Sequence, residues 1–117
     1  MKKPRWAYHP NNKDRWKRLV FHFDFLKKVE EEEGKLWCEY CGKNELVVYS
    51  WDQKPNRKDM ATVDHFLPRS KYPDLTSEET NFIVACSTCN EKKKDDIWEV
   101  ETIKHGRKVK EKLNNLN

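Results

Sequence analysis

Three polar residues, Asp64, His65 and Asn90, are of the types that metal-assisted hydrolysis requires. A carboxylate and an amide oxygen are hard ligands that suit Mg²⁺ or Mn²⁺. A histidine titrates near neutral pH and can act as a general base. On a β-strand, Asp64 and His65 would point to opposite faces, so that one binds an ion and the other faces the attacking water. Taken alone, the three residues are also compatible with a surface Asp-His pair and a helix-capping Asn.

Four cysteines form two Cys-x-x-Cys pairs, Cys38 with Cys41 and Cys86 with Cys89. This pairing favours one four-thiolate zinc site over two disulfides, and such a site has no vacant position, so its zinc is expected to be structural. The 44 residues between the pairs include the Asp-His pair. Zinc binding would therefore close a large loop and supply much of the folding free energy. The alternatives are two redox pairs or incidental thiols.

The composition suits one small domain with a thin core. The chain has 117 residues, of which 36% are hydrophobic and 38% charged. We therefore expect the small core to need additional stabilisation, such as a bound zinc ion. It has no apolar run of the length that a signal peptide or a membrane helix requires, which predicts a cytoplasmic protein with no membrane partner.

Positive charge is concentrated toward both ends of the chain. The net charge is +4, with seven Lys or Arg against one Asp in residues 1–18 and five against one Glu in residues 104–112. Basic ends on a compact module indicate contact with a polyanion, most simply a nucleic acid. The alternative is an ordinary solvated surface.

The elements that would position these residues begin with a helix over Lys13–Glu33, capped by Asn11 or Asn12 and ended by Gly34. His22 is expected to be a half-buried histidine of this helix. The helical spacing predicts a buried stripe, formed by Trp16, Leu19, Val20, Phe23, Leu26 and Val29.

Downstream, the β-forming runs Leu46–Trp51 and Met60–Phe66 predict a β-hairpin. Residues 67–80 have no periodicity and predict a long functional loop. A helix is expected from Cys86 to about Trp98, followed by a basic helical extension over residues 99–117.

Several of these residues together resemble the HNH endonuclease family in its four-cysteine, zinc-bound form, over about residues 37–96. The matching residues are Asp64, His65, Pro68, Ser70, Asn81, Cys86, Cys89, Asn90 and Lys93. The resemblance implies an α+β protein with a small ββα-metal, treble-clef-like core. That core would cover residues 37–98, between a basic arm and long helix (1–36) and the C-terminal extension (99–117), all in a single nuclease domain.

The resemblance also implies roles. His65 would be the general base, Asp64 and Asn90 would hold the catalytic Mg²⁺ or Mn²⁺, and Asn81 would pin the long loop by hydrogen bonds. Asn90 stands where some members have the last His of the family name. Phosphate contacts are expected from Arg69, Lys92 and Lys93.

The implied function is a metal-dependent DNA endonuclease or nickase, most simply acting on duplex DNA. By analogy it would be a free-standing phage or mobile-element enzyme that works beside a packaging terminase. Two alternatives from other classes are a non-catalytic, zinc-stabilised nucleic-acid-binding module and a protein-interaction zinc domain.

Overall fold

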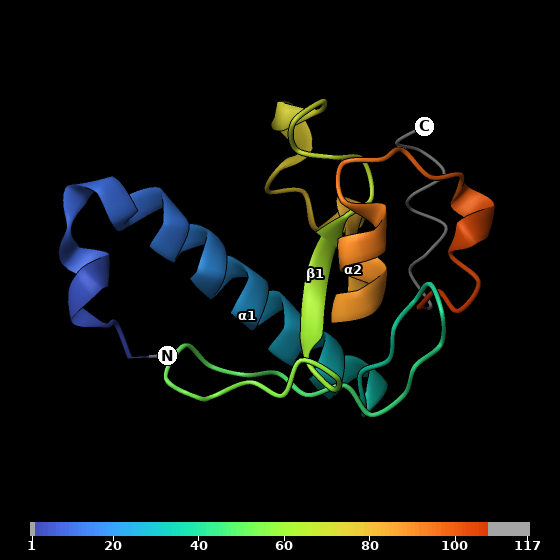
Figure 1. Cartoon of the computed structure of the whole chain (residues 1–117), viewed down its shortest axis with the longest axis horizontal. Coiled ribbons are helices and arrows are strands. Elements are labelled where there is room, and N and C mark those ends of the chain that lie inside the picture. The colour runs from blue at the N-terminus through green and yellow to red at the C-terminus, as the bar shows by residue number, and fades with distance from the viewer. Residues whose placement is uncertain (1, 108–117) are drawn as a thin grey trace.

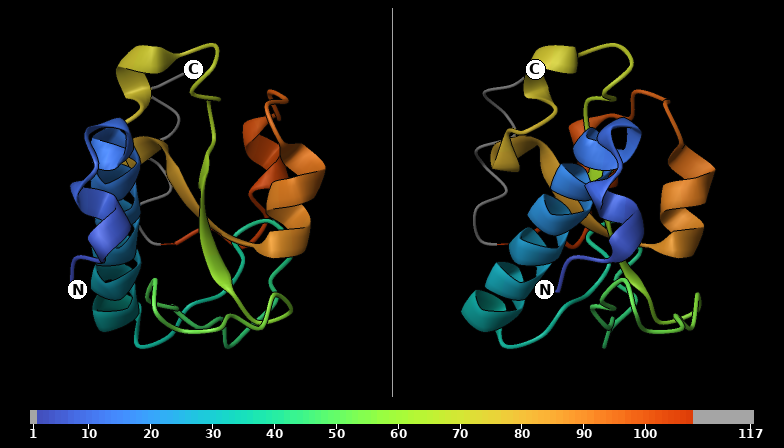
Figure 2. Two further views of the ribbon diagram at one scale, coloured as in Figure 1. Left: turned by 60° about the vertical axis from the view of Figure 1, so that its left-hand side comes forward. Right: turned by 90° about the vertical axis from the view of Figure 1, so that its left-hand side faces the viewer.

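A two-stranded sheet lies between two helices in the computed structural model of this chain, which describes residues 2–107. The helices are α1 (Lys13–Glu33) and α2 (Ser87–Lys93), and the strands are β1 (Ala61–His65) and β2 (Phe82–Cys86). Figure 1 labels α1, β1 and α2, and the left-hand view of Figure 2 shows β1 between the two helices. The α+β class and the ββα order expected from the sequence are confirmed.

Helix α1 has the bounds that its end signals predict. Gly34 ends it in the left-handed conformation (φ 80°), and its N–H donates to the Glu30 carbonyl at 2.8 Å. Glycine adopts this conformation without the steric penalty of a Cβ atom. Asn12 occupies the cap position, but its side chain does not cap the helix, because its amide nitrogen donates to the Trp6 carbonyl at 3.0 Å.

The buried face of α1 lies in its C-terminal half. Phe25, Leu26 and Val29 are buried there, and the Phe25 ring packs edge-on against Phe82 of β2, with centroids 5.1 Å apart. The expected stripe was therefore right at Leu26 and Val29 but missed Phe25. Its other members are only half-buried; these are Trp16, Leu19, Val20 and Phe23.

The expected hairpin is wrong, because β1 pairs with β2. The two strands are antiparallel, with Asp64 opposite Ile83 and His65 opposite Phe82. The segment 46–51 contributes only an isolated parallel bridge between Val47 and Met60. All five residues of β2 are buried, so pairing β1 with β2 places the most apolar run of the chain inside the core.

Helix α2 is shorter than expected. It ends at Lys93, because Lys94 takes a positive φ of 49° that does not continue a helix. In the expected C-terminal extension, the structure describes a 3₁₀ turn at Val100–Thr102. The helix expected further on, over residues 108–117, lies outside the described residues.

The long loop over residues 67–80 joins the two strands, as Figure 1 shows at the upper end of β1. Only a 3₁₀ turn at Pro73–Leu75 and the start of another at Glu79–Asn81 interrupt it. The loop therefore starts and ends beside the ends of the strands that carry His65 and Phe82.

Candidate active site and zinc site

The four cysteine sulfurs gather in one cluster, with all Sγ atoms within 4.8 Å of one another. Cys38 and Cys41 lie on a tight turn, Cys86 ends β2, and Cys89 lies in α2. Neighbouring backbone N–H groups of Cys41 and Cys89 donate to Sγ of Cys38 and Cys86, at 3.5 Å each. The cysteines form no disulfides. Four sulfurs this close fit a zinc site, which the two Cys-x-x-Cys pairs predicted.

The turn of the first pair depends on Gly42. Its φ of 82° is left-handed, and its N–H donates to the Cys38 carbonyl at 2.8 Å. An added Cβ would also lie 2.9 Å from the His105 ring. Both the backbone conformation and the close approach therefore favour glycine here.

Two of the four thiols resist ionisation unless a cation is bound, whereas hydrogen bonds lower the pKa of the more exposed Cys41 thiol. Burial raises the pKa of the Cys38 thiol, and burial together with the neighbouring sulfurs raises the pKa of the Cys89 thiol. Zinc binding requires thiolates, so a bound ion would reverse this cost and couple folding to metal.

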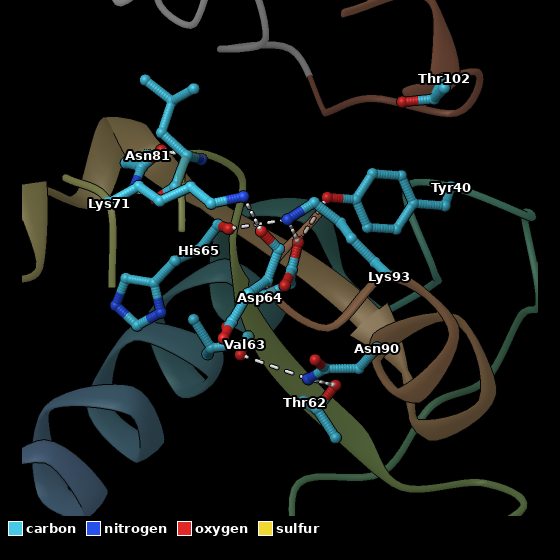
Figure 3. A network of polar contacts seen from close by, with 12 residues as sticks. Tyr40, Thr62, Val63, Asp64, His65, Lys71, Asn81, Asn90, Lys93 and Thr102 are labelled. Carbon is cyan, nitrogen blue, oxygen red and sulfur yellow. Dashed lines mark hydrogen bonds and ion pairs between the residues drawn. The ribbon is translucent and has the colours of Figure 1, made fainter. Parts of the chain in front are cut away.

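Asp64 projects from β1 toward α2, as Figure 3 shows. Its side chain is 5% exposed, and its Oδ2 accepts a hydrogen bond from the Tyr40 hydroxyl at 2.5 Å and lies 3.3 Å from Nζ of Lys93. Burial raises the pKa of the Asp64 carboxyl, while the hydrogen bond from Tyr40 and the charge of Lys93 oppose that rise. Both polar partners use Oδ2, which leaves Oδ1 as the atom that a cation could bind.

His65 projects to the opposite side of β1, toward α1 (Figure 3). Its ring packs against Phe82 and His22, with centroid distances of 5.1 and 5.4 Å. Its Nε2 lies 2.9 Å from the Thr76 carbonyl oxygen. A carbonyl can only accept, so Nε2 carries the proton and Nδ1 of the neutral ring is a free base. Burial lowers the pKa of His65, although the Thr76 hydrogen bond opposes this.

Asn90 lies on α2 and reaches back to β1. Its side-chain nitrogen donates to Thr62 Oγ1 at 2.9 Å and, more weakly, to the Val63 carbonyl at 3.5 Å (Figure 3). These bonds fix which end of the amide faces the strand, so the oxygen is the end left for a ligand. Lys93, one helical turn further along, contacts Asp64. The structure therefore brings Asp64 and Asn90 to the same side of β1.

Asn81 ties the two ends of the long loop together. Its side-chain oxygen accepts from the Leu67 N–H at 2.8 Å, and its nitrogen donates to the Leu67 carbonyl at 3.0 Å. Its own carbonyl also accepts from the Phe66 N–H at 2.9 Å. Asn81 is fully buried. This arrangement is the one that the expected loop-pinning role requires.

Lys93 does not lie where a phosphate contact was expected. It is fully buried, with Nζ bound to Asp64 and to the His65 carbonyl, the latter at 3.0 Å. Neutralising the buried carboxylate is the physical reason for its position, since a buried charge needs a partner. The other two expected contacts, Arg69 and Lys92, are exposed.

Sequence reasoning missed three neighbours of the site: Tyr40, Thr62 and Thr76. Tyr40 lies 24 residues from its partner Asp64 in the sequence, and Thr76 lies 11 residues from its partner His65. No local spacing predicts either contact. Thr62 could have been found, because its position two residues before Asp64 places it on the same face of β1.

The sequence of residues 38–96 matches the HNH endonuclease family. This match spans just over half of the chain and covers the cysteine cluster and every residue of the candidate active site. The chain belongs to the HNH endonuclease family. Neither the curated proteins nor the solved structures include a match to it. Among the described helices, none has the length and apolar character needed to cross a membrane.

Proposed function

We propose that this protein is a metal-dependent DNA endonuclease or nickase in which His65 is the general base. Membership of the HNH endonuclease family indicates nuclease activity. The observation that best supports metal-dependent cleavage with His65 as the base is that the two faces of β1 carry different functional groups. His65 offers an unprotonated Nδ1 on one side, and Asp64 with Asn90 offers oxygen ligands on the other.

The residues on the α2 side of β1 fit a hard divalent ion. Asp64 Oδ1 and Asn90 Oδ1 are oxygen donors of the kind that Mg²⁺ and Mn²⁺ prefer, and in both side chains the other polar atom is held by protein groups. When bound, the ion would supply electrostatic stabilisation of the phosphate and of the leaving oxygen.

In this proposal, His65 takes a proton from water at Nδ1 while the water oxygen attacks the phosphorus in line. The bond from phosphorus to the 3′ oxygen breaks with its electron pair on that oxygen, which takes a proton from solvent. The products are a 5′ phosphate and a 3′ hydroxyl. The Thr76 carbonyl holds Nε2–H throughout, so it keeps the ring oriented and stabilises the imidazolium that forms. Asn81 holds the loop that carries Thr76.

The basic N-terminal region supports a polyanionic substrate. Among its described side chains, Lys3 lies 4.4 Å over the Tyr8 ring and Arg15 lies 5.0 Å over the Trp6 ring. A basic arm of this kind suits contact with a phosphate backbone. A phage or mobile-element origin and a packaging terminase as partner remain proposals by analogy.

One observation favours the non-catalytic nucleic-acid-binding alternative. The Asp64 carboxylate already has a buried cation in Lys93 and a hydroxyl donor in Tyr40, so its charge is balanced when no metal is bound. A binding module would need nothing more from this residue.

Plasmid nicking with Mg²⁺ or Mn²⁺ separates the two functions. We expect wild type to convert supercoiled DNA to nicked or linear product, and His65→Ala to lose about 10²- to 10⁴-fold in rate, the usual effect of a general base. His9→Ala, which removes an exposed histidine outside the site, is the matched control and should cut like wild type. Equal nicking rates for wild type and His65→Ala would refute the proposed nuclease activity with His65 as the base.

A further inference from the structure

A pocket of about 440 Å³ opens between α1 and the long loop, next to the proposed general base. Its apolar lining includes Trp16, Val20 and Phe21 from α1, and the loop contributes Thr76 and Ser77. The volume lies in the range of pockets that hold small organic groups. None of the roles proposed so far uses it.

The pocket shares two residues with the surroundings of His65. Thr76 lines the pocket and accepts the hydrogen bond from His65 Nε2 at 2.9 Å. His22 also lines it, and its ring centroid lies 5.4 Å from that of His65. A group bound in the pocket would therefore lie beside the residue that faces the scissile phosphate.

The chemistry of the lining suits a nucleobase. Phe21 remains 40% exposed although its ring packs edge-on against Phe82, so part of this apolar surface stays open to a ligand. Lys17 and Arg18 are exposed cations of the same lining, and among the described residues of that lining Asp24 is the only acid. Aromatic surface flanked by cations is the arrangement on which proteins bind unpaired bases while their phosphates meet positive charge.

We propose that this pocket binds one unpaired base of the DNA strand that passes His65. This inference rests on the proposed function and deepens it, because it names an unpaired or locally opened stretch as the preferred substrate form. A base within an intact duplex keeps its faces stacked and could enter only after leaving the stack, which costs free energy. The pocket therefore favours single-stranded, gapped or mismatched DNA over perfect duplex.

The test is a binding measurement without added Mg²⁺ or Mn²⁺, in buffer that keeps zinc bound. Fluorescence anisotropy compares a labelled single-stranded oligonucleotide with an abasic strand of equal length and phosphate count. We expect wild type to bind the base-bearing strand about tenfold more tightly at equal salt, because the abasic strand has no base to place in the pocket. Equal affinity for both strands would overturn the proposal.

A variant that fills the pocket tests whether the preference for the base-bearing strand arises there. Ser77→Trp introduces a ring from the exposed loop wall and should abolish the preference for bases while leaving abasic binding within about twofold of wild type. Gln53→Trp adds the same ring at an exposed turn outside the pocket and should retain the preference. If Ser77→Trp keeps the tenfold preference with an unchanged melting temperature, the bases bind elsewhere and the proposal is wrong.

Failure of this inference is distinguishable from failure of the proposed function. Binding is measured without catalytic metal, so a base preference that Ser77→Trp removes would stand even if no DNA were cut. Conversely, a wild-type protein that nicks DNA efficiently but binds both strands equally would support the proposed nuclease activity and contradict base binding in the pocket.

Discussion

Asp64 combines deep burial with a negative charge, and Lys93 is what makes this possible. Their charged atoms lie 3.3 Å apart, with side chains 5% and 0% exposed. Removing one partner of a buried pair leaves an uncompensated charge, whereas removing both can be nearly neutral. The pair therefore acts as a unit in the folded protein.

We expect Lys93→Met to destabilise the protein by about 3–5 kcal/mol, because it leaves the Asp64 carboxylate buried without its cation. Asp64→Asn in the same background should recover much of that loss. Denaturant unfolding of the two single variants and the double variant measures the coupling. Additive effects of the two changes would contradict the buried pair.

His65 allows a prediction about pH. Burial lowers its pKa below the ordinary value, so the neutral base persists to more acidic pH than in an exposed histidine. The acid limb of kcat/KM against pH is therefore expected below about pH 6.5. The profile of DNA nicking measures this limb, with His9→Ala as the control. An acid limb above pH 6.5 would contradict a buried, neutral His65 as the base.

At the scale of elements, the site depends on how the long loop returns to the sheet. β1 and β2 place His65 opposite Phe82, and the loop between them brings the Thr76 carbonyl to His65. Asn81 closes this loop through two hydrogen bonds to the backbone of Leu67. Loop geometry and the orientation of the general base are thus linked.

Asn81→Ala should test that link. It leaves the buried N–H and carbonyl of Leu67 without partners, at a cost of roughly 1–3 kcal/mol for each group. Nicking activity should fall more than DNA affinity, because the loop no longer orients His65 while the exposed cations are unchanged. Thermal unfolding and anisotropy binding measure the two effects. Asn81→Asp, which can still accept from the Leu67 N–H, should lose less activity than Asn81→Ala; equal losses would argue against orientation by these bonds.

At the scale of the whole molecule, the cysteine cluster and the candidate active site share β2 and α2. Cys86 ends β2, and Cys89 directly precedes Asn90 on α2. Cys38 and Cys41 come from a turn that also carries Tyr40, the donor to Asp64. An ion held by these thiolates would therefore fix three segments that meet at the active site.

Removal of zinc by a chelator should unfold much of the chain and abolish nicking, even with Mg²⁺ in excess, because the four-thiolate ion contributes directly to folding. Circular dichroism and plasmid nicking follow the loss. Returning Zn²⁺ should restore both signals, whereas Mg²⁺ alone should restore neither. A zinc-free protein with unchanged melting temperature and full cleavage rate would disprove the coupling.

Features that depend on local signals could be predicted from the sequence alone. Gly34 ended α1 where predicted because its left-handed conformation suits a residue without Cβ, and the Cys-x-x-Cys spacings identified the four sulfurs that cluster. The combined pattern of residues from Asp64 to Lys93, with Cys86 and Cys89 included, indicated the family. The domain division and the residue roles remain predictions.

Which distant segments meet depends on long-range packing. β1 pairs with β2 and not with segment 46–51, because burial of the whole β2 run outweighs the local β-propensity of the nearer segment. The same long-range packing buries Lys93 against Asp64, brings Thr76 to His65 and opens the pocket beside them. These contacts join residues far apart in the chain, so no local periodicity or spacing could have revealed them.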